Sequence, residues 1–272
     1  MVTLNLPQPI RTPVPSWDGT SLSVLDYGGV GRLTVLLHGL AGHAGEWTEV
    51  ASRMTSETHK VAFDQRGHGQ SSRRPSGVSR ADYVADVVEL INHFSQGQGP
   101  VNLVGQSLGG HTAMLVAARH PPLVARLVMV EATPDGPSSE SIERARRWFA
   151  RWPRPLASEE AAIEFFGPTA PAWLAGMERR EDGWWPCFDD DVMLATMGEA
   201  SGEWLDDWAV VGCPTLLVRG GEGWMTEDLS DLESSGPSLR MVTVPGAGHD
   251  VQLDAPRRLA ELINEDLRSE TA

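Results

Sequence analysis

The residues best suited to covalent chemistry form the pattern Gly105-x-Ser107-x-Gly109, which stands between two apolar segments. Residues 101–104 form a short apolar run typical of a buried strand, and residues 112–120 are apolar nearly all round, as in a buried helix. A sharp turn from strand to helix strains its central residue and leaves no room for side chains two positions away. The pattern therefore predicts that the Ser107 hydroxyl is exposed at a helix N-terminus, where the helix dipole favours negative charge.

Four apolar runs of strand type alternate with helical segments between residues 33 and 131. This alternation predicts a parallel sheet with helices on both faces, in which a ligand lies beyond the carboxyl ends of the strands. Four polar residues fall at those ends, and we expect them to gather at one edge of the sheet: His38, Asp64, Ser107 and Glu131. Before these strands, the turn signal Asp18-Gly19 predicts an antiparallel hairpin at the sheet edge.

The strand rhythm breaks between residues 134 and 208, where no clear strand is visible and seven of the ten tryptophans occur. We interpret 134–208 as a helical cap inserted over the open edge of the sheet, with helices near 138–151, 158–166 and 190–199. Residues 1–133 and 209–272 then form the core domain, in which strands near 215–219 and 240–244 and a terminal helix complete the sheet. A few of the cap aromatics are expected to line a pocket, since ligand pockets are largely apolar and aromatic.

Composition excludes several classes of partner. The net charge of −15 disfavours nucleic acid and anionic membranes, both of which require a basic face. No stretch is long and apolar enough to span a bilayer, and the first 15 residues contain no apolar segment of signal-peptide type. Cys187 and Cys213 do not make a disulfide framework or a metal-type spacing, so we expect two unpaired thiols and a cytoplasmic protein.

Four motifs, in this order, resemble those of the α/β-hydrolase superfamily over nearly the whole chain: Leu37-His38-Gly39-Leu40, Asp64-x-Arg66-Gly67-His68-Gly69-x-Ser71, Gly105-x-Ser107-x-Gly109-Gly110 and Gly246-Ala247-Gly248-His249. The resemblance implies an α/β fold with a mostly parallel eight-stranded sheet, helices on both faces and an inserted helical cap. It implies Ser107 as nucleophile, His249 as base, and the backbone N–H groups of Leu40 and Leu108 as oxyanion donors. No metal or organic cofactor is implied.

The chemistry supports the same roles, because serine is inert at its own pKa until a neighbouring imidazole accepts its proton. Of the eight histidines, only His249 follows a strand in a glycine-rich loop from which it can reach over the site. His38 and His68 belong to loops that the family uses structurally. His111 stands four residues after Ser107, and we expect it to pack beneath the serine.

The sequence departs from the family pattern at the acid. Most members place an aspartate in a G-x-x-D pattern after the strand that is here 215–219, but this chain has Gly223 or Trp224 at that place. A minority, including some haloalkane dehalogenases and lactone hydrolases, take the acid from the end of the strand that follows the elbow helix. That position here is Glu131, which we predict to orient His249. Three other carboxylates remain as alternatives: Glu222, Glu227 and Asp228.

These residues predict a serine hydrolase that cleaves an ester or lactone of a hydrophobic small molecule through an acyl-enzyme. Two alternatives keep the same triad: a hydrolase of carbon–carbon bonds and a cofactor-free haloperoxidase-type enzyme. A third alternative is a non-catalytic ligand receptor on the same scaffold, which fold alone does not exclude. The serine argues against dehalogenases and epoxide hydrolases, which use an aspartate nucleophile.

Overall fold

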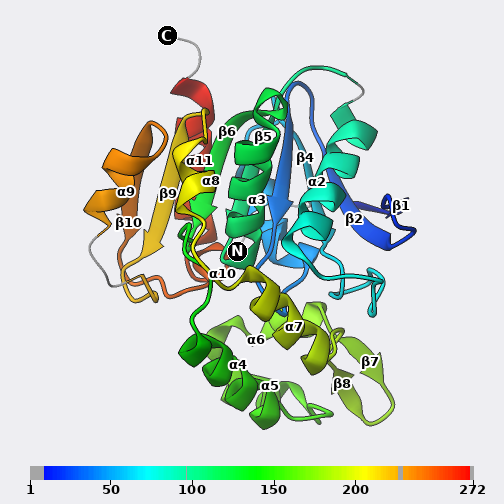
Figure 1. Ribbon diagram of the computed structural model, residues 1–272. Coiled ribbons are helices and arrows are strands. Elements are labelled where there is room, and N and C mark those ends of the chain that lie inside the picture. The colour runs from blue at the N-terminus through cyan, green and yellow to red at the C-terminus, as the bar shows by residue number, and fades with distance from the viewer. Residues whose placement is uncertain (1–8, 96, 226–228, 270–272) are drawn as a thin grey trace.

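The computed structural model describes residues 9–95, 97–225 and 229–269. One sheet runs through the molecule, with strands in the order β1-β2-β4-β3-β5-β6-β9-β10 (Figure 1). Its eight strands are β1 (Ile10–Pro15), β2 (Ser21–Gly28), β3 (Leu33–Leu37), β4 (His59–Asp64), β5 (Val101–Gln106), β6 (Val124–Val130), β9 (Thr215–Gly220) and β10 (Leu239–Val244). β1 and β2 form an antiparallel hairpin, β2 pairs antiparallel with β4, and all other neighbours are parallel. The predicted α/β-hydrolase fold is confirmed.

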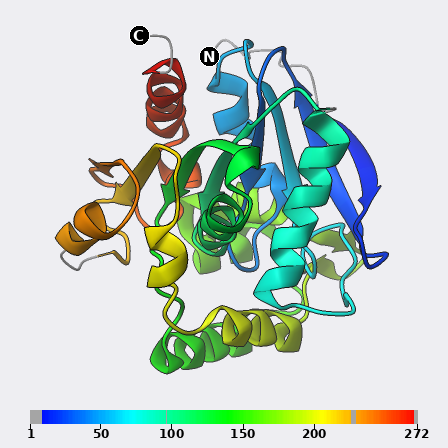
Figure 2. The same ribbon diagram turned by 45° about the horizontal axis from the view of Figure 1, so that its top comes forward.

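Helices cover both faces of the sheet (Figure 2). Side chains of α2 (Arg80–Ser95), α3 (Leu108–Arg119) and α8 (Leu205–Ala209) belong to one buried apolar cluster, and those of α1 (Thr48–Arg53) and α11 (Pro256–Arg268) to another. The central strands β3 and β5 are buried at every position, as continuous apolar runs of parallel strands require. The short elements of the core are η1 (Ala44–Trp47), η2 (Pro121–Leu123), α9 (Ser230–Ser235) and α10 (Val251–Asp254).

Residues 139–200 form a separate layer beside the sheet, which we call the cap layer (Figure 1). It contains α4 (Ser139–Arg151), α5 (Glu159–Phe166), η3 (Gly167–Thr169), α6 (Ala170–Ala175), β7 (Glu178–Arg180), β8 (Gly183–Trp185) and α7 (Asp190–Ala200). Its core is aromatic, because the Trp152 ring touches those of Trp148, Phe165, Phe166, Trp173 and Phe188. Ala41, just beyond the end of β3, packs into the same cluster, so the cap layer lies at the carboxyl ends of the strands.

Two features of the 134–208 segment differ from the sequence-based expectation. β7 and β8 pair as a small antiparallel sheet of their own, separate from the main sheet. Strands of three residues are too short to show the alternation that identifies a strand in a sequence. In addition, α8 packs on the core: Trp208 is buried with the sheet helices, and its Nε1 donates to the Leu232 carbonyl at 3.2 Å. The cap layer therefore ends before α8, which is earlier in the chain than the predicted boundary at residue 208.

Within the described residues, no helix combines the length and the apolar character that a membrane crossing needs. Cys187 and Cys213 are both free thiols, as expected for the chain.

Candidate active site

Ser107 stands between β5 and α3 with φ 49° and ψ −119°, in the left-handed region that side chains rarely adopt. Close packing around it explains the neighbouring glycines. A Cβ atom at Gly105 would lie 2.3 Å from the Gly109 carbonyl oxygen, and one at Gly109 would lie 2.5 Å from the carbonyl oxygens of Leu37 and His38. The Ser107 N–H donates to the Val130 carbonyl at 2.9 Å, which ties the turn to the adjacent strand β6.

The predicted oxyanion donors flank Ser107. Leu108 is the first residue of α3, so its N–H belongs to the first helical turn, which has no acceptor within the helix. The loop after β3 passes directly beside the serine, because a Cβ atom at Gly39 would lie 3.3 Å from the Ser107 Cβ atom. Leu40 therefore follows at the same edge of the sheet. The assignment of these two N–H groups as an oxyanion hole stays a prediction.

The structure brings Glu131 and His249 together, although 118 residues separate them in the sequence: His249 Nδ1 lies 3.3 Å from Glu131 Oε2. Glu131 directly follows β6, and His249 lies in the loop between β10 and α10. The Glu131 side chain is fully buried, whereas the His249 side chain is 17% exposed. A buried carboxylate against one imidazole nitrogen fixes the tautomer that leaves the other nitrogen free to accept a proton.

Three donors hold the Glu131 carboxylate. The Gly220 N–H donates to Oε1 at 2.7 Å, the Trp224 N–H donates to Oε2 at 2.9 Å, and His249 contacts Oε2 as described. Burial raises the pKa of this carboxyl, but the hydrogen bonds from His249, Gly220 and Trp224 outweigh burial and lower the pKa below its ordinary value. Glu131 is therefore ionised at neutral pH. Its backbone, like that of Ser107, has a positive φ, here 48°.

Of the other carboxylates that could supply the acid, only Glu222 falls within the described residues. Glu222 is exposed, and its N–H donates to the Ala247 carbonyl at 2.8 Å. Glu227 and Asp228 lie outside the described residues. The predicted place of an aspartate in the G-x-x-D pattern, Gly223 or Trp224, carries no acid, and the Glu131 carboxylate fills the space beside Gly223: a Cβ atom there would lie 2.4 Å from Glu131 Oε1.

Sequence reasoning missed two contacts of His249. The Trp224 ring is stacked on the imidazole, with ring centroids 3.9 Å apart and planes inclined by 9°. Gln106, the residue before the serine, donates from Nε2 to the His249 carbonyl at 3.0 Å. Trp224 had been singled out only as the residue standing where an acid was expected, and nothing local in the sequence indicated a stacking partner.

The remaining polar residues at the strand ends hold loops in place. The Asp64 carboxylate accepts hydrogen bonds from the N–H groups of Ala44 at 2.7 Å and Gln70 at 2.9 Å. His38 is fully buried, its Nε2 accepts from the Gln65 N–H at 3.0 Å, and burial keeps its pKa well below the ordinary value. His111 is buried in α3, where its backbone N–H donates to the Ser107 carbonyl at 3.0 Å and its ring lies edge-on against that of Trp204.

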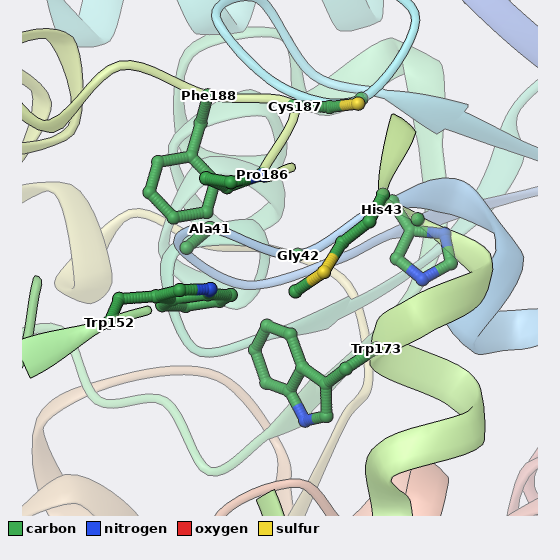
Figure 3. Close-up of a pocket in the computed structure, with 11 residues that line it drawn as sticks. Ala41, Gly42, His43, Trp152, Trp173, Pro186, Cys187 and Phe188 are labelled. Atoms are coloured by element: carbon green, nitrogen blue, oxygen red, sulfur yellow. The ribbon is translucent and has the colours of Figure 1, made fainter. Parts of the chain in front are cut away.

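A narrow pocket of about 10 Å³ lies between the cap layer and the loop that continues from Leu40 (Figure 3). Three aromatic side chains of the cap layer line it, namely Trp152, Trp173 and Phe188, together with Ala41 to His43 of the loop after β3. A wider cavity of about 330 Å³ shares His43 with this pocket and has a polar lining that includes Arg11, Asp64 and Arg73.

Comparison with known proteins shows the family to which the chain belongs. Residues 34–262 match the sequence model of the alpha/beta hydrolase family. Among curated proteins, 2-(acetamidomethylene)succinate hydrolase of Mesorhizobium japonicum is 26% identical over 238 residues, which cover 84% of this chain and 85% of that protein. Esterase Rv0045c of Mycobacterium tuberculosis is 29% identical over 273 residues, covering 93% and 90% respectively.

The crystal structure of E-2-(acetamidomethylene)succinate hydrolase superposes on the protein with a TM-score of 0.85 at 25% identity, covering 96% of this chain and 99% of that one. The chain belongs to the α/β hydrolase family. It is an enzyme of the hydrolase class, and its relatives include both an esterase and a succinate-derivative hydrolase.

Proposed function

We propose that this enzyme is a serine hydrolase that cleaves carboxylic esters of hydrophobic small molecules with Ser107, His249 and Glu131 as its triad. Ser107 attacks the ester carbonyl, and the free ring nitrogen of His249 accepts the hydroxyl proton. Glu131 orients the ring and stabilises the imidazolium that forms. The imidazolium then gives its proton to the departing alcohol, which leaves an acyl-enzyme.

Water completes the reaction. His249 removes a proton from the water molecule that attacks the acyl group, and Ser107 leaves with the proton restored to its hydroxyl. In both steps the negative charge on the carbonyl oxygen is stabilised by the N–H groups of Leu40 and Leu108, which flank Ser107 and need no reorganisation during the reaction.

One observation carries the proposal: the buried Glu131 carboxylate lies 3.3 Å from His249 Nδ1, in a site whose serine has the strained backbone of a strand-to-helix turn. A structural ion pair alone does not explain why Ser107 and Glu131 both adopt positive φ at the same sheet edge. The aromatic cluster of the cap layer, against which Leu40 and Ala41 pack, supports a hydrophobic acyl or alcohol group. The similarity to an esterase supports the ester as the bond cleaved.

Fluorophosphonate labelling followed by ester turnover tests the proposal. Intact mass should show one phosphonylated site on the wild-type enzyme, and peptide mapping should place it at Ser107. Ser107→Ala should remain unlabelled and lose hydrolysis of a p-nitrophenyl ester by ~10⁴-fold or more. Ser201→Ala, which removes an exposed serine directly after the cap layer, is the matched control and should behave as wild type.

Three outcomes would contradict the proposal. Near-normal turnover by Ser107→Ala would show that Ser107 is not the nucleophile. Labelling without turnover of any ester would favour a ligand receptor. Turnover confined to vinylogous diketones would favour the carbon–carbon bond hydrolase, which uses the same three residues on a different bond.

A further inference from the structure

Trp224 contacts both partners of the Glu131–His249 pair. Its backbone N–H donates to Glu131 Oε2 at 2.9 Å, and its ring lies flat on the His249 imidazole at a centroid distance of 3.9 Å. The residue is 67% exposed, so burial of apolar surface does not account for its position. An exposed tryptophan held flat against a histidine that contacts a buried carboxylate indicates a role for the stack itself.

The cap layer contributes a third member to this stack. The guanidinium of Arg144, on α4, lies 5.5 Å from the centroid of the Trp224 ring, within the range of a cation–π contact. Arg144, Trp224 and His249 thus form a connection from the cap layer to the imidazole. It joins three segments that are distant in the sequence: α4, the loop after β9 and the loop after β10.

We propose that Trp224 is a positioning residue for His249, and that Arg144 holds Trp224 in place from the cap layer. The inference rests on the proposed function, in which His249 is the base. A single contact from Glu131 to Nδ1 fixes one point of the imidazole but leaves the ring free to rotate about that contact. A flat aromatic neighbour fixes the plane of the ring, and with it the direction of the free nitrogen.

The stack also favours the charged intermediate of the proposed reaction. When His249 accepts the serine proton it becomes a cation, and a cation over the face of a tryptophan is attracted by the ring quadrupole. The neutral resting imidazole has a weaker interaction of this kind. Trp224 therefore contributes to kcat more than to substrate binding, which separates it from a residue that only lines the site.

Side-chain substitution isolates this role, because any residue except proline at position 224 keeps the N–H that donates to Glu131. We expect Trp224→Ala to lower kcat for a p-nitrophenyl ester by about 3- to 10-fold, with KM changed by less than about 2-fold. Trp224→Phe keeps a stacking ring and should recover kcat to within about 2-fold of wild type. Arg144→Ala should lie between Trp224→Ala and wild type.

Trp185→Ala is the matched control. Trp185 is another tryptophan under an arginine, with Arg180 4.8 Å from its ring centroid, but it lies on the separate β7–β8 sheet. This variant should keep wild-type kcat and KM. If Trp224→Ala has the same kcat and KM as Trp185→Ala, or if it only raises KM, Trp224 is not a positioning residue. If Arg144→Ala keeps the kcat of Trp185→Ala while Trp224→Ala does not, the role of Arg144 is refuted and that of Trp224 stands.

NMR of the resting enzyme gives a second measurement that does not depend on turnover. Ring protons of His249, assigned by their loss in His249→Ala, should be displaced upfield by the ring current of Trp224 and should return toward ordinary positions in Trp224→Ala or Arg144→Ala. Undisplaced His249 protons in the wild type would overturn the proposal. The His249 signals also separate the stack from the proposed triad. Activity of Ser107→Ala would refute the triad, whereas the chemical shifts of the His249 ring protons test only the stack on Trp224.

Discussion

Gly223 and Glu131 occupy complementary space: a Cβ atom on Gly223 would lie 2.4 Å from Glu131 Oε1. The carboxylate from the end of β6 fills the room that a side chain after β9 would need. The N–H groups of Gly220 and Trp224, in the loop after β9, both donate to this carboxylate. The carboxylate that arrives from the neighbouring strand is therefore held by N–H groups of the β9 loop, in space that a side chain at 223 would have to share.

Glu131→Gln should abolish most activity while the fold is kept. The amide preserves size but can present an N–H to the imidazole, which favours the tautomer that does not accept the serine proton. The loss of kcat could approach ~10⁴-fold, as for the equivalent change in the Ser-His-Asp triad. Steady-state kinetics of Glu131→Gln and Glu222→Gln side by side checks this, because Glu222 is exposed and its variant should remain active. A dead Glu222 variant, or two active ones, would contradict the assignment.

Moving the acid to the β9 loop should restore part of the lost activity. Gly223→Asp alone should destabilise the protein and lower turnover, because the new side chain overlaps the Glu131 carboxylate and repels its charge. In Glu131→Ala/Gly223→Asp that space is vacated, and we expect kcat at least ~10-fold above that of Glu131→Ala, which corresponds to about 1.4 kcal/mol of recovered transition-state stabilisation. Equal kcat values for the double variant and Glu131→Ala would show that the loop cannot carry the acid.

Glu46 should make the protein less stable as the pH rises. Burial raises the pKa of this carboxyl to about 8, and the negative charge of Asp250 adds to the increase. Between an unfolded pKa near 4.5 and pH 8, the folded chain retains a proton that the unfolded chain has lost, so the free energy of unfolding falls across this window. The slope contributed by this group is at most about 1.4 kcal/mol per pH unit.

Urea unfolding of Glu46→Gln between pH 5 and 8 measures this effect. The variant should gain stability relative to wild type as the pH increases, whereas Glu49→Gln, which changes a half-exposed residue of α1, should run parallel to wild type. Glu131 contributes with the opposite sign. Its lowered pKa stabilises the folded state above an unfolded pKa near 4.5, and this contribution is lost as the pH falls through the folded pKa. Parallel curves for wild type and Glu46→Gln would refute the prediction.

Trp152→Ala should destabilise the protein by about 3–5 kcal/mol, since the ring is 4% exposed and lies at the centre of the cap-layer aromatics. Denaturant unfolding followed by circular dichroism measures the change. Trp17→Ala is the control, because Trp17 is 59% exposed and its loss should change stability by less than ~0.5 kcal/mol. Equal stability of the two variants would mean that the aromatic cluster does not support the fold.

Local constraints made much of this protein predictable from its sequence. Buried strands read as continuous apolar runs, the glycines at 105 and 109 mark a turn that excludes side chains, and Ser79 with Asp82 opens α2 through reciprocal hydrogen bonds of 2.9 and 3.2 Å. Each of these signals depends on residues within a few positions of one another. The sequence therefore indicated the fold, the strand-to-helix turn at Ser107 and the edge of the sheet at which the polar residues gather.

The tertiary structure decided which groups meet at that edge. Several carboxylates stood near the ends of strands in the sequence, but only the pairing of β6 between β5 and β9 places Glu131 under the N–H groups of Gly220 and Trp224. The stack of Trp224 on His249 and the placement of α8 on the core have the same origin. They depend on how loops and helices from distant segments pack together, which no local periodicity or turn chemistry encodes.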